Sequence, residues 1–142
     1  MARLKIIIPE NKINTFTIPV RISDVNYGNH VGNDAIVSII HEARVQWLSQ
    51  HNFTELNIDG AGLIMSDLEI EFKKESFYGD VIEVQLSIGE ISKKSFEIYY
   101  QLYTKRNGER IVLTVAKTGI VCYNYLNKKV VTIPDVLKNI II

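Results

Sequence analysis

Residues 21–49 read RISDVNYGNHVGNDAIVSIIHEARVQWLS, and their character changes near residue 33. The first part is dense in Asp, Asn and Gly, which is typical of a structured loop. From about Asp34 to Ser49 the apolar residues recur at helical spacing, with polar residues between them. Asn33 or Asp34 is a suitable N-cap for this helix. The stretch therefore predicts a loop followed by an amphipathic helix.

Strand patterns lie on both sides of this helix. Residues 15–22 alternate apolar and polar side chains, and Pro19 favours a sheet edge or a bulge because proline donates no backbone hydrogen bond. Four more strands are predicted at about residues 63–73, 81–90, 95–105 and 110–123, with an Asn-Gly hairpin signal at Asn107. No helical pattern separates these four strands. The order favours an α+β fold with an antiparallel sheet.

Length and charge limit the classes of protein to consider. The 142 residues suit one domain spanning residues 1–142, and one helix leaves sheet edges open, so we expect a homodimer or homotetramer. Sixteen basic residues balance sixteen acidic ones, which argues against a nucleic-acid partner. We expect no membrane span. The single Cys122 fits a reducing compartment, with the cytoplasm as the expected location.

Motifs for several common chemistries are missing from the chain. It has no Gly-rich phosphate loop, no Gly-x-Ser-x-Gly elbow and no His-Glu-x-x-His helix. The three histidines, His30, His41 and His51, lack the spacing of a metal site. We therefore expect neither a metal nor another cofactor.

The segment from Arg21 to Asp34, followed by Glu42-Ala-Arg44, resembles the signature of hotdog-fold acyl thioesterases of the 4-hydroxybenzoyl-CoA thioesterase type. That signature is broadly Arg-x-x-Asp-x-Asp-x-x-Gly-His-Val-x-Asn, with Glu-x-Ala-Arg on the following helix. Residues 72–80 and 131–134 extend the resemblance, which covers about residues 15–137. It implies a hotdog fold, in which an antiparallel sheet wraps a long central helix. It also implies hydrolysis of an acyl-CoA or acyl-carrier-protein thioester.

One departure from this signature concerns the catalytic aspartate. Asn26 stands where the family has the second Asp, the residue usually assigned as nucleophile or general base. A neutral amide is a poor base and a poor nucleophile, so Asn26 is expected to orient water or the thioester instead. The replacement also motivates an alternative function, a non-catalytic protein that binds acyl thioesters on the same fold.

The remaining chemistry is assigned from this resemblance together with the residue types. The backbone N–H of Asn33, assisted by that of Asp34, is expected to hold the oxyanion at the positive end of the helix. The Asp34 side chain is expected to cap the helix, with a direct role in substrate binding as the alternative. His30 is expected to position substrate, with a structural role as the alternative. Lys73 and Lys74, together with Lys93 and Lys94, are candidate contacts for coenzyme A phosphates, with simple solvation as the alternative.

Three carboxylates are candidates for the missing base. Glu42 ranks first, because another branch of hotdog thioesterases carries its catalytic Glu at a similar distance along the helix. Its alternative is a structural Glu paired with Arg or backbone. Asp24 ranks second, with loop ordering as the alternative. Asp67 ranks third, because in hotdog dimers the strand after the helix approaches the partner's site and brings Asp67 toward substrate. Its alternative is a solvated or hydrogen-bonded Asp on the strand.

Overall fold

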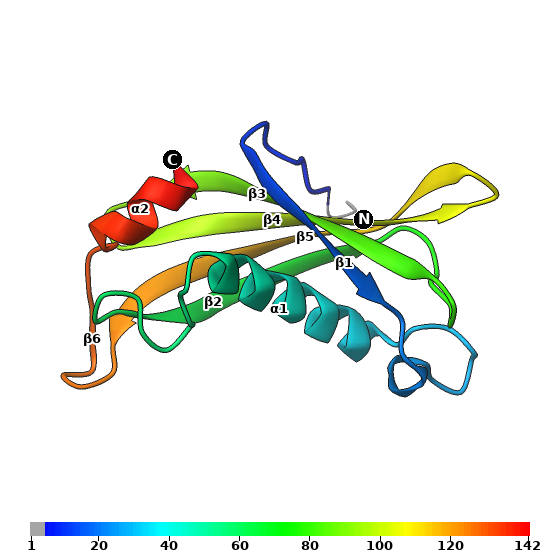
Figure 1. The fold of residues 1–142 in the computed structure, drawn as a ribbon, viewed down its shortest axis with the longest axis horizontal. Coiled ribbons are helices and arrows are strands. Elements are labelled where there is room, and N and C mark those ends of the chain that lie inside the picture. The colour runs from blue at the N-terminus through cyan, green and yellow to red at the C-terminus, as the bar shows by residue number, and fades with distance from the viewer. Residues whose placement is uncertain (1–4) are drawn as a thin grey trace.

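The computed structural model describes residues 5–142 and places a long helix on one face of a curved antiparallel sheet (Figure 1). The sheet has the strand order β1-β3-β4-β5-β2, with β6 beside β5. The elements in chain order are β1 (Lys12–Pro19), η1 (Ile22–Asp24), α1 (Asn33–Gln50), β2 (Gly62–Phe72), β3 (Val81–Ile91), β4 (Ser95–Arg106), β5 (Glu109–Asn124), β6 (Lys129–Val130) and α2 (Asp135–Ile141).

Alternation along the strands builds the inner face of the sheet. In β3, Ile82, Val84, Leu86 and Ile88 are buried, whereas Glu83 and Gln85 between them are half-buried. The hairpin between β4 and β5 turns at residues 107 and 108, which both have positive φ (52° and 77°), as the Asn-Gly pair allows. Local sequence preference and burial therefore select the same register.

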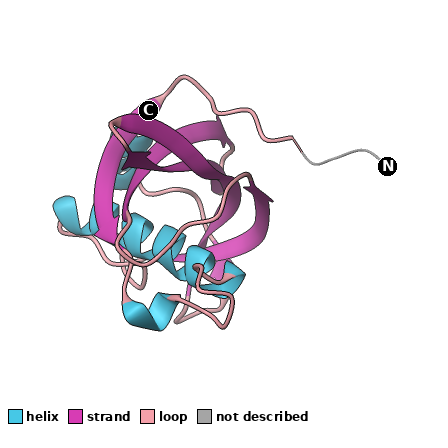
Figure 2. Cartoon of the chain, turned by 90° about the vertical axis from the view of Figure 1, so that its right-hand side faces the viewer, coloured by secondary structure: helices cyan, strands magenta, loops and turns pink. Residues whose placement is uncertain are grey.

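Helix α1 packs its apolar stripe against this inner face. Figure 2, which looks along the molecule from one end, shows the strands curving around the helix. A hydrophobic side chain that is fully buried contributes about 1.5–3 kcal/mol, so this stripe is a large part of the driving force for folding. The buried residues of the stripe include Ile36, Ile39, Ile40, Ala43, Trp47 and Leu48.

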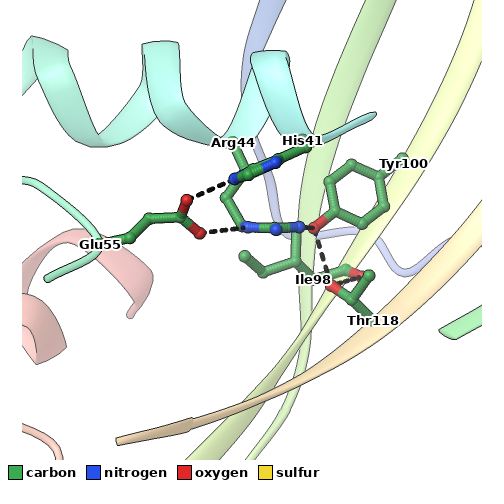
Figure 3. A network of polar contacts seen from close by, with 6 residues as sticks. All are labelled: His41, Arg44, Glu55, Ile98, Tyr100 and Thr118. Atoms are coloured by element: carbon green, nitrogen blue, oxygen red, sulfur yellow. Dashed lines mark hydrogen bonds and ion pairs between the residues drawn. The ribbon is translucent and has the colours of Figure 1, made fainter. Parts of the chain in front are cut away.

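One charged side chain lies inside this apolar interface (Figure 3). The guanidinium of Arg44 donates from Nε to Oε2 of Glu55 (3.0 Å) and from Nη1 to the hydroxyl of Tyr100 on β4 (3.1 Å). The Tyr100 hydroxyl in turn lies 2.7 Å from Oγ1 of Thr118 on β5. His41 contacts the other oxygen of Glu55. The network joins α1, the segment after it and two central strands.

Most of the predicted elements are confirmed. Helix α1 and strands β2 to β5 begin and end within about one residue of the expected bounds, and β1 lies at an edge of the sheet, as Pro19 predicted. The first strand, however, begins and ends three residues before its predicted bounds. It ends at Pro19, and Ile22, expected on the buried face, begins η1 and is 73% exposed. The short elements β6 and α2 were not predicted.

Replacing Glu55 by Gln tests the Arg44 network through its pH dependence. Burial raises the pKa of Glu55, but the hydrogen bonds from His41 and Arg44 outweigh burial and hold this pKa below the ordinary 4.5. Because the folded pKa is depressed, the ionised carboxylate stabilises the fold above that value and loses this effect as the pH falls through the folded pKa. Urea denaturation is expected to show Glu55→Gln destabilised by about 1 kcal/mol at pH 7, and by less below pH 4.

Glu69→Gln is the matched control for this experiment, because Glu69 makes only a long surface ion pair with Lys117 (3.7 Å). Its effect on the free energy of unfolding is expected to stay below about 0.5 kcal/mol. A Glu55→Gln penalty that is the same at pH 3 and pH 7 contradicts the assignment of an ionised Glu55 to the network.

Candidate active site

The N-terminus of α1 exposes backbone donors. Gly32 is the N-cap, and the first helical bond runs from the Ile36 N–H to the Gly32 carbonyl (3.1 Å). The N–H groups of residues 33–35 therefore have no partner inside the helix and lie at its positive end. The prediction that Asn33 or Asp34 caps the helix was wrong, because both lie within the first turn. A Cβ at Gly32 would lie 2.6 Å from Oδ1 of Asp34, so glycine leaves room for that carboxylate.

Asp24 fixes the loop that leads into the helix. Its side chain is buried and accepts hydrogen bonds from the backbone N–H of Arg21 (2.8 Å) and from the Arg21 guanidinium (3.2 Å). Its carbonyl oxygen accepts from the Gly32 N–H (3.0 Å). These contacts close the loop on itself and match the loop-ordering alternative that the sequence left open for Asp24.

Asn26 shapes a tight turn inside the same loop. Its Oδ1 accepts from the Gly28 N–H (2.9 Å), its N–H donates to the His30 carbonyl (3.0 Å), and its carbonyl accepts from the Asn29 N–H (3.1 Å). Asn29 has a positive φ of 63°, which asparagine tolerates better than most residues. The Oδ1 of Asn26 therefore already accepts a hydrogen bond within the turn, and its Nδ2 lies toward Gly32.

The loop joins the end of β2 and forms a pocket beside the helix N-terminus. The Val31 N–H donates to the Ser76 carbonyl (2.7 Å), and His30 forms an antiparallel bridge with Phe77. The resulting cavity of about 240 Å³ is called the α1 pocket below. It brings together four residues predicted for the site, His30, Asn33, Lys73 and Lys74. Its lining is completed by Val31, Ile36, Phe72, Glu75, Ser76 and Thr114.

Glu42 and Asp24 line a different cavity. This β1–α1 groove of about 430 Å³ lies between β1 and the solvent side of α1 and includes Thr17, Arg21, Val45 and Gln46. The Glu42 carboxylate accepts from Nε2 of Gln46 (2.8 Å). Glu42 follows Asn33 by nine residues, which is roughly 13 Å along a helix axis. Within one chain the structure therefore does not bring Glu42 beside the Asn33 N–H.

Asp67 also lies outside the α1 pocket. Its Oδ1 accepts from the Gly119 N–H across the β2–β5 pairing (3.0 Å), and it lines a third cavity of about 230 Å³. Its expected approach to substrate depends on a second copy of the chain.

Three residues of the α1 pocket were missed by the sequence analysis: Glu75, Ser76 and Thr114. Glu75 and Ser76 become neighbours of the helix N-terminus through the pairing of residues 30–31 with residues 76–77, whereas Thr114 joins the lining through its pairing with Phe72. The sequence carries one signal for Glu75 and Ser76, the strand end before Tyr78-Gly-Asp80, but nothing local says which loop that strand end contacts. Ser76 is 3% exposed, and its Oγ has no hydrogen-bond partner among residues 5–142.

Two features are absent from residues 5–142. No group of three or more His, Cys, Asp or Glu side chains is arranged to hold a metal ion in this part of the chain. None of its helices has the length and apolar character needed to cross a membrane.

Comparisons with known proteins place the chain in a family. Residues 20–141 match the model of the thioesterase-like superfamily. The chain belongs to this superfamily. A protein of Acaryochloris marina named 1,4-dihydroxy-2-naphthoyl-CoA hydrolase is 28% identical over 137 residues, covering 86% of this chain and 90% of that protein. The predicted membership of the thioesterase superfamily is thereby confirmed.

Solved structures of the same superfamily share the fold. A 1,4-dihydroxy-2-naphthoyl-CoA thioesterase from Synechocystis superimposes with a TM-score of 0.81 at 23% identity, covering 92% of this chain and 96% of that one. An Asp-to-Asn mutant of 4-hydroxybenzoyl-CoA thioesterase, complexed with 4-hydroxybenzoyl-CoA, gives a TM-score of 0.79 at 14% identity, with coverage of 91% and 98%. The predicted hotdog architecture is confirmed.

Replacing Asp24 tests how the loop is held. Asp24→Ala removes the acceptor for the Arg21 N–H and is expected to lower the free energy of unfolding by about 2 kcal/mol, because hydrogen bonds to charged groups contribute that much. Asp24→Asn keeps an acceptor oxygen of the same shape and is expected to cost about half as much. Urea denaturation measures both variants. Equal stability of Asp24→Ala and the wild type would show that the loop does not depend on this carboxylate.

Proposed function

We propose that this chain hydrolyses acyl-CoA thioesters, with an aromatic acyl group as the preferred substrate class. The observation that carries the proposal is the α1 pocket, in which Asn33 at the helix N-terminus, His30 and two lysines share one cavity. The aromatic class is supported by the names of the relatives, which act on or bind dihydroxynaphthoyl-CoA and hydroxybenzoyl-CoA. The apolar lining of the pocket, Val31, Ile36 and Phe72, suits such an acyl group.

The start of α1 supplies electrostatic stabilisation for the reaction. Attack on a thioester carbonyl moves negative charge onto its oxygen, and donors aimed at that oxygen lower the barrier. The Asn33 N–H, with the Asp34 N–H beside it, fills this role. His30 lies in the same pocket, with Nδ1 3.2 Å from the Val31 carbonyl, so its ring is held in place to position the substrate. Asn26 acts through the turn that carries His30.

In this proposal, Lys73 and Lys74 bind the phosphates of coenzyme A. Both are exposed at the end of β2, where they line the pocket. The chain has no net charge, so an anionic coenzyme must be attracted by local cations and not by the overall field. Lys93 and Lys94, by contrast, precede β4 at the opposite end of the sheet from the pocket, where their carbonyls accept from Ile133 and Cys122.

A second copy of the chain is part of the proposal. Strand β2 is an edge strand, and Met65 and Phe72 on it are 42% and 45% exposed. Pairing of two such edges hides apolar side chains and unpaired backbone groups. A homodimer or homotetramer would also bring Asp67 near a neighbouring site.

The proposal also covers the cellular location of the protein and the carrier of the acyl group. We place the protein in the cytoplasm, because its one cysteine, Cys122, is buried and unpaired, and burial raises the pKa of the thiol to about 11. An acyl-carrier-protein thioester would present the same reactive atoms to the α1 pocket as acyl-CoA. The alternative of a non-catalytic binder is not favoured by relatives whose names are those of hydrolases.

A panel of thioesters tests the activity directly. Dihydroxynaphthoyl-CoA, hydroxybenzoyl-CoA, acetyl-CoA and palmitoyl-CoA are incubated with the protein, and free thiol is measured. We expect multiple turnovers, with kcat/KM for the aromatic thioesters at least roughly tenfold above that for acetyl-CoA, because a larger apolar group fills the pocket. Tight binding of every thioester without release of thiol would instead support the non-catalytic alternative.

The double variant Lys73→Ala, Lys74→Ala tests the coenzyme contacts. Loss of two charge-assisted contacts of about 1 kcal/mol each is expected to raise KM for acyl-CoA by about tenfold or more and to leave kcat nearly unchanged. The same acyl group on N-acetylcysteamine lacks the coenzyme phosphates, so its KM is expected not to change. The variant Lys93→Ala, Lys94→Ala is the control. A KM that rises equally for both thiol carriers would place the lysines elsewhere in the mechanism.

A further inference from the structure

Hydrolysis at the α1 pocket needs a base close to the oxyanion donors. Water is a weak nucleophile at neutral pH, and a positioned carboxylate that takes its proton contributes typically 10²–10⁴-fold to the rate. Asn26 cannot take a proton, and its Oδ1 already accepts from the Gly28 N–H. The base must therefore be another residue that reaches this pocket.

Glu75 is the single carboxylate among the ten residues that line the α1 pocket. It shares the cavity with Asn33, whose N–H is the proposed oxyanion donor, and with His30. A reacting carbonyl held at the helix N-terminus would therefore have this carboxylate in the wall of the same cavity. General base catalysis requires that arrangement of donor, reacting atom and base.

The backbone around Glu75 is fixed while its side chain remains available. Nη2 of Arg106 donates to the Glu75 carbonyl (2.9 Å) and pairs with Asp80 (2.6 Å), and the next carbonyl, of Ser76, accepts from the Val31 N–H (2.7 Å). The Glu75 carboxylate itself takes part in none of the ion pairs or hydrogen bonds found among residues 5–142. A tethered backbone with an uncommitted carboxylate suits a general base.

Ser76 gives independent support for a polar ligand at this wall. Its hydroxyl is buried, and no residue of 5–142 accepts or donates to it. Buried hydroxyls in native proteins normally have a hydrogen-bond partner, so an unmade bond next to Glu75 marks a place where water or substrate binds.

The other candidate carboxylates are engaged or remote. Asp24 is paired with Arg21, Glu42 with Gln46 in the β1–α1 groove, and Asp67 with the Gly119 N–H. The Asp34 carboxylate lies against Gly32, and Asp34 does not line the pocket.

We propose that Glu75 is the general base that activates the attacking water, an assignment that rests on the proposed thioester hydrolysis. The Glu75 carboxylate takes one proton from water while the water oxygen forms a bond to the carbonyl carbon. The π electron pair moves onto the carbonyl oxygen, which the N–H groups at the start of α1 hold. When the carbonyl re-forms, the C–S bond breaks and its electron pair leaves on sulfur. Glu75 returns the proton to the thiolate, which gives a carboxylic acid and a free thiol.

Glu75→Gln tests this role in the full-length protein. We expect kcat to fall by about 10²–10⁴-fold, and the acidic limb of the pH profile of kcat/KM to disappear with the titrating group. Because Glu75 is exposed, the urea midpoint of the variant is expected to equal that of the wild type. The Kd of a non-hydrolysable acyl-CoA thioether is expected to stay within about twofold of the wild-type value. Glu75→Asp keeps a carboxylate and is expected to retain more activity than Glu75→Gln.

Glu109→Gln, an exposed glutamate at the β4–β5 hairpin, is the matched control and is expected to keep the wild-type kcat. A Glu75→Gln variant with kcat within threefold of the wild type overturns the proposal while leaving the proposed hydrolysis intact. The proposal is also overturned, and the proposed hydrolysis left intact, if Glu42→Gln removes the acidic limb of the pH profile and Glu75→Gln does not. Failure of the wild type to hydrolyse any thioester overturns both.

Discussion

A buried guanidinium determines where the central helix lies on the sheet. Arg44 is 5% exposed, and a charge removed from water is tolerated only where its donors are satisfied. Its partners are Glu55, which follows the helix, and Tyr100, in the middle of β4. Sliding α1 by one turn along the apolar face would leave the guanidinium without these partners. The network therefore adds positional specificity to an interface whose driving force is hydrophobic.

Fixing the helix at Arg44 also fixes its N-terminus, three turns away. There the loop of residues 21–32 is closed by Asp24 and by the turn at Asn26, and it pairs with residues 76–77 at the end of β2. That pairing sets free helical N–H groups beside two lysines and a glutamate. The site is thus assembled from segments about 40 residues apart, and each is held by backbone hydrogen bonds while its functional side chains stay exposed.

Sequence reasoning predicted the elements well because local signals are strong in this chain. The helical spacing of residues 34–49 and the Asn-Gly turn at residue 107 both specify structure within a few residues. The loop signature also singled out Asn33, which begins α1 and lines the α1 pocket. The N-cap was misassigned because Asn33 and Asp34 are good capping residues by type, whereas the chain uses the backbone freedom and small size of Gly32.

Sequence reasoning could not have proposed Glu75 as the base, for a geometric reason. Glu42 is near Asn33 in the chain, but the helix carries it into the β1–α1 groove. Glu75 is distant in the chain, and only the contact between residues 30–31 and 76–77 brings it to the pocket. Which strand end meets which loop is a property of the tertiary fold, and no motif in either segment encodes it.

In the proposed reaction, substrate binds at the N-terminus of α1 and not in the larger β1–α1 groove. Amide chemical shifts of ¹⁵N-labelled protein, recorded during titration with a non-hydrolysable thioether analogue of hydroxybenzoyl-CoA, test it most directly. We expect the largest shift changes on residues 30–36 and 72–76, which include most of the pocket lining. Changes centred on residues 17–21 and 42–46 would contradict it and would move the site to the groove that contains Glu42.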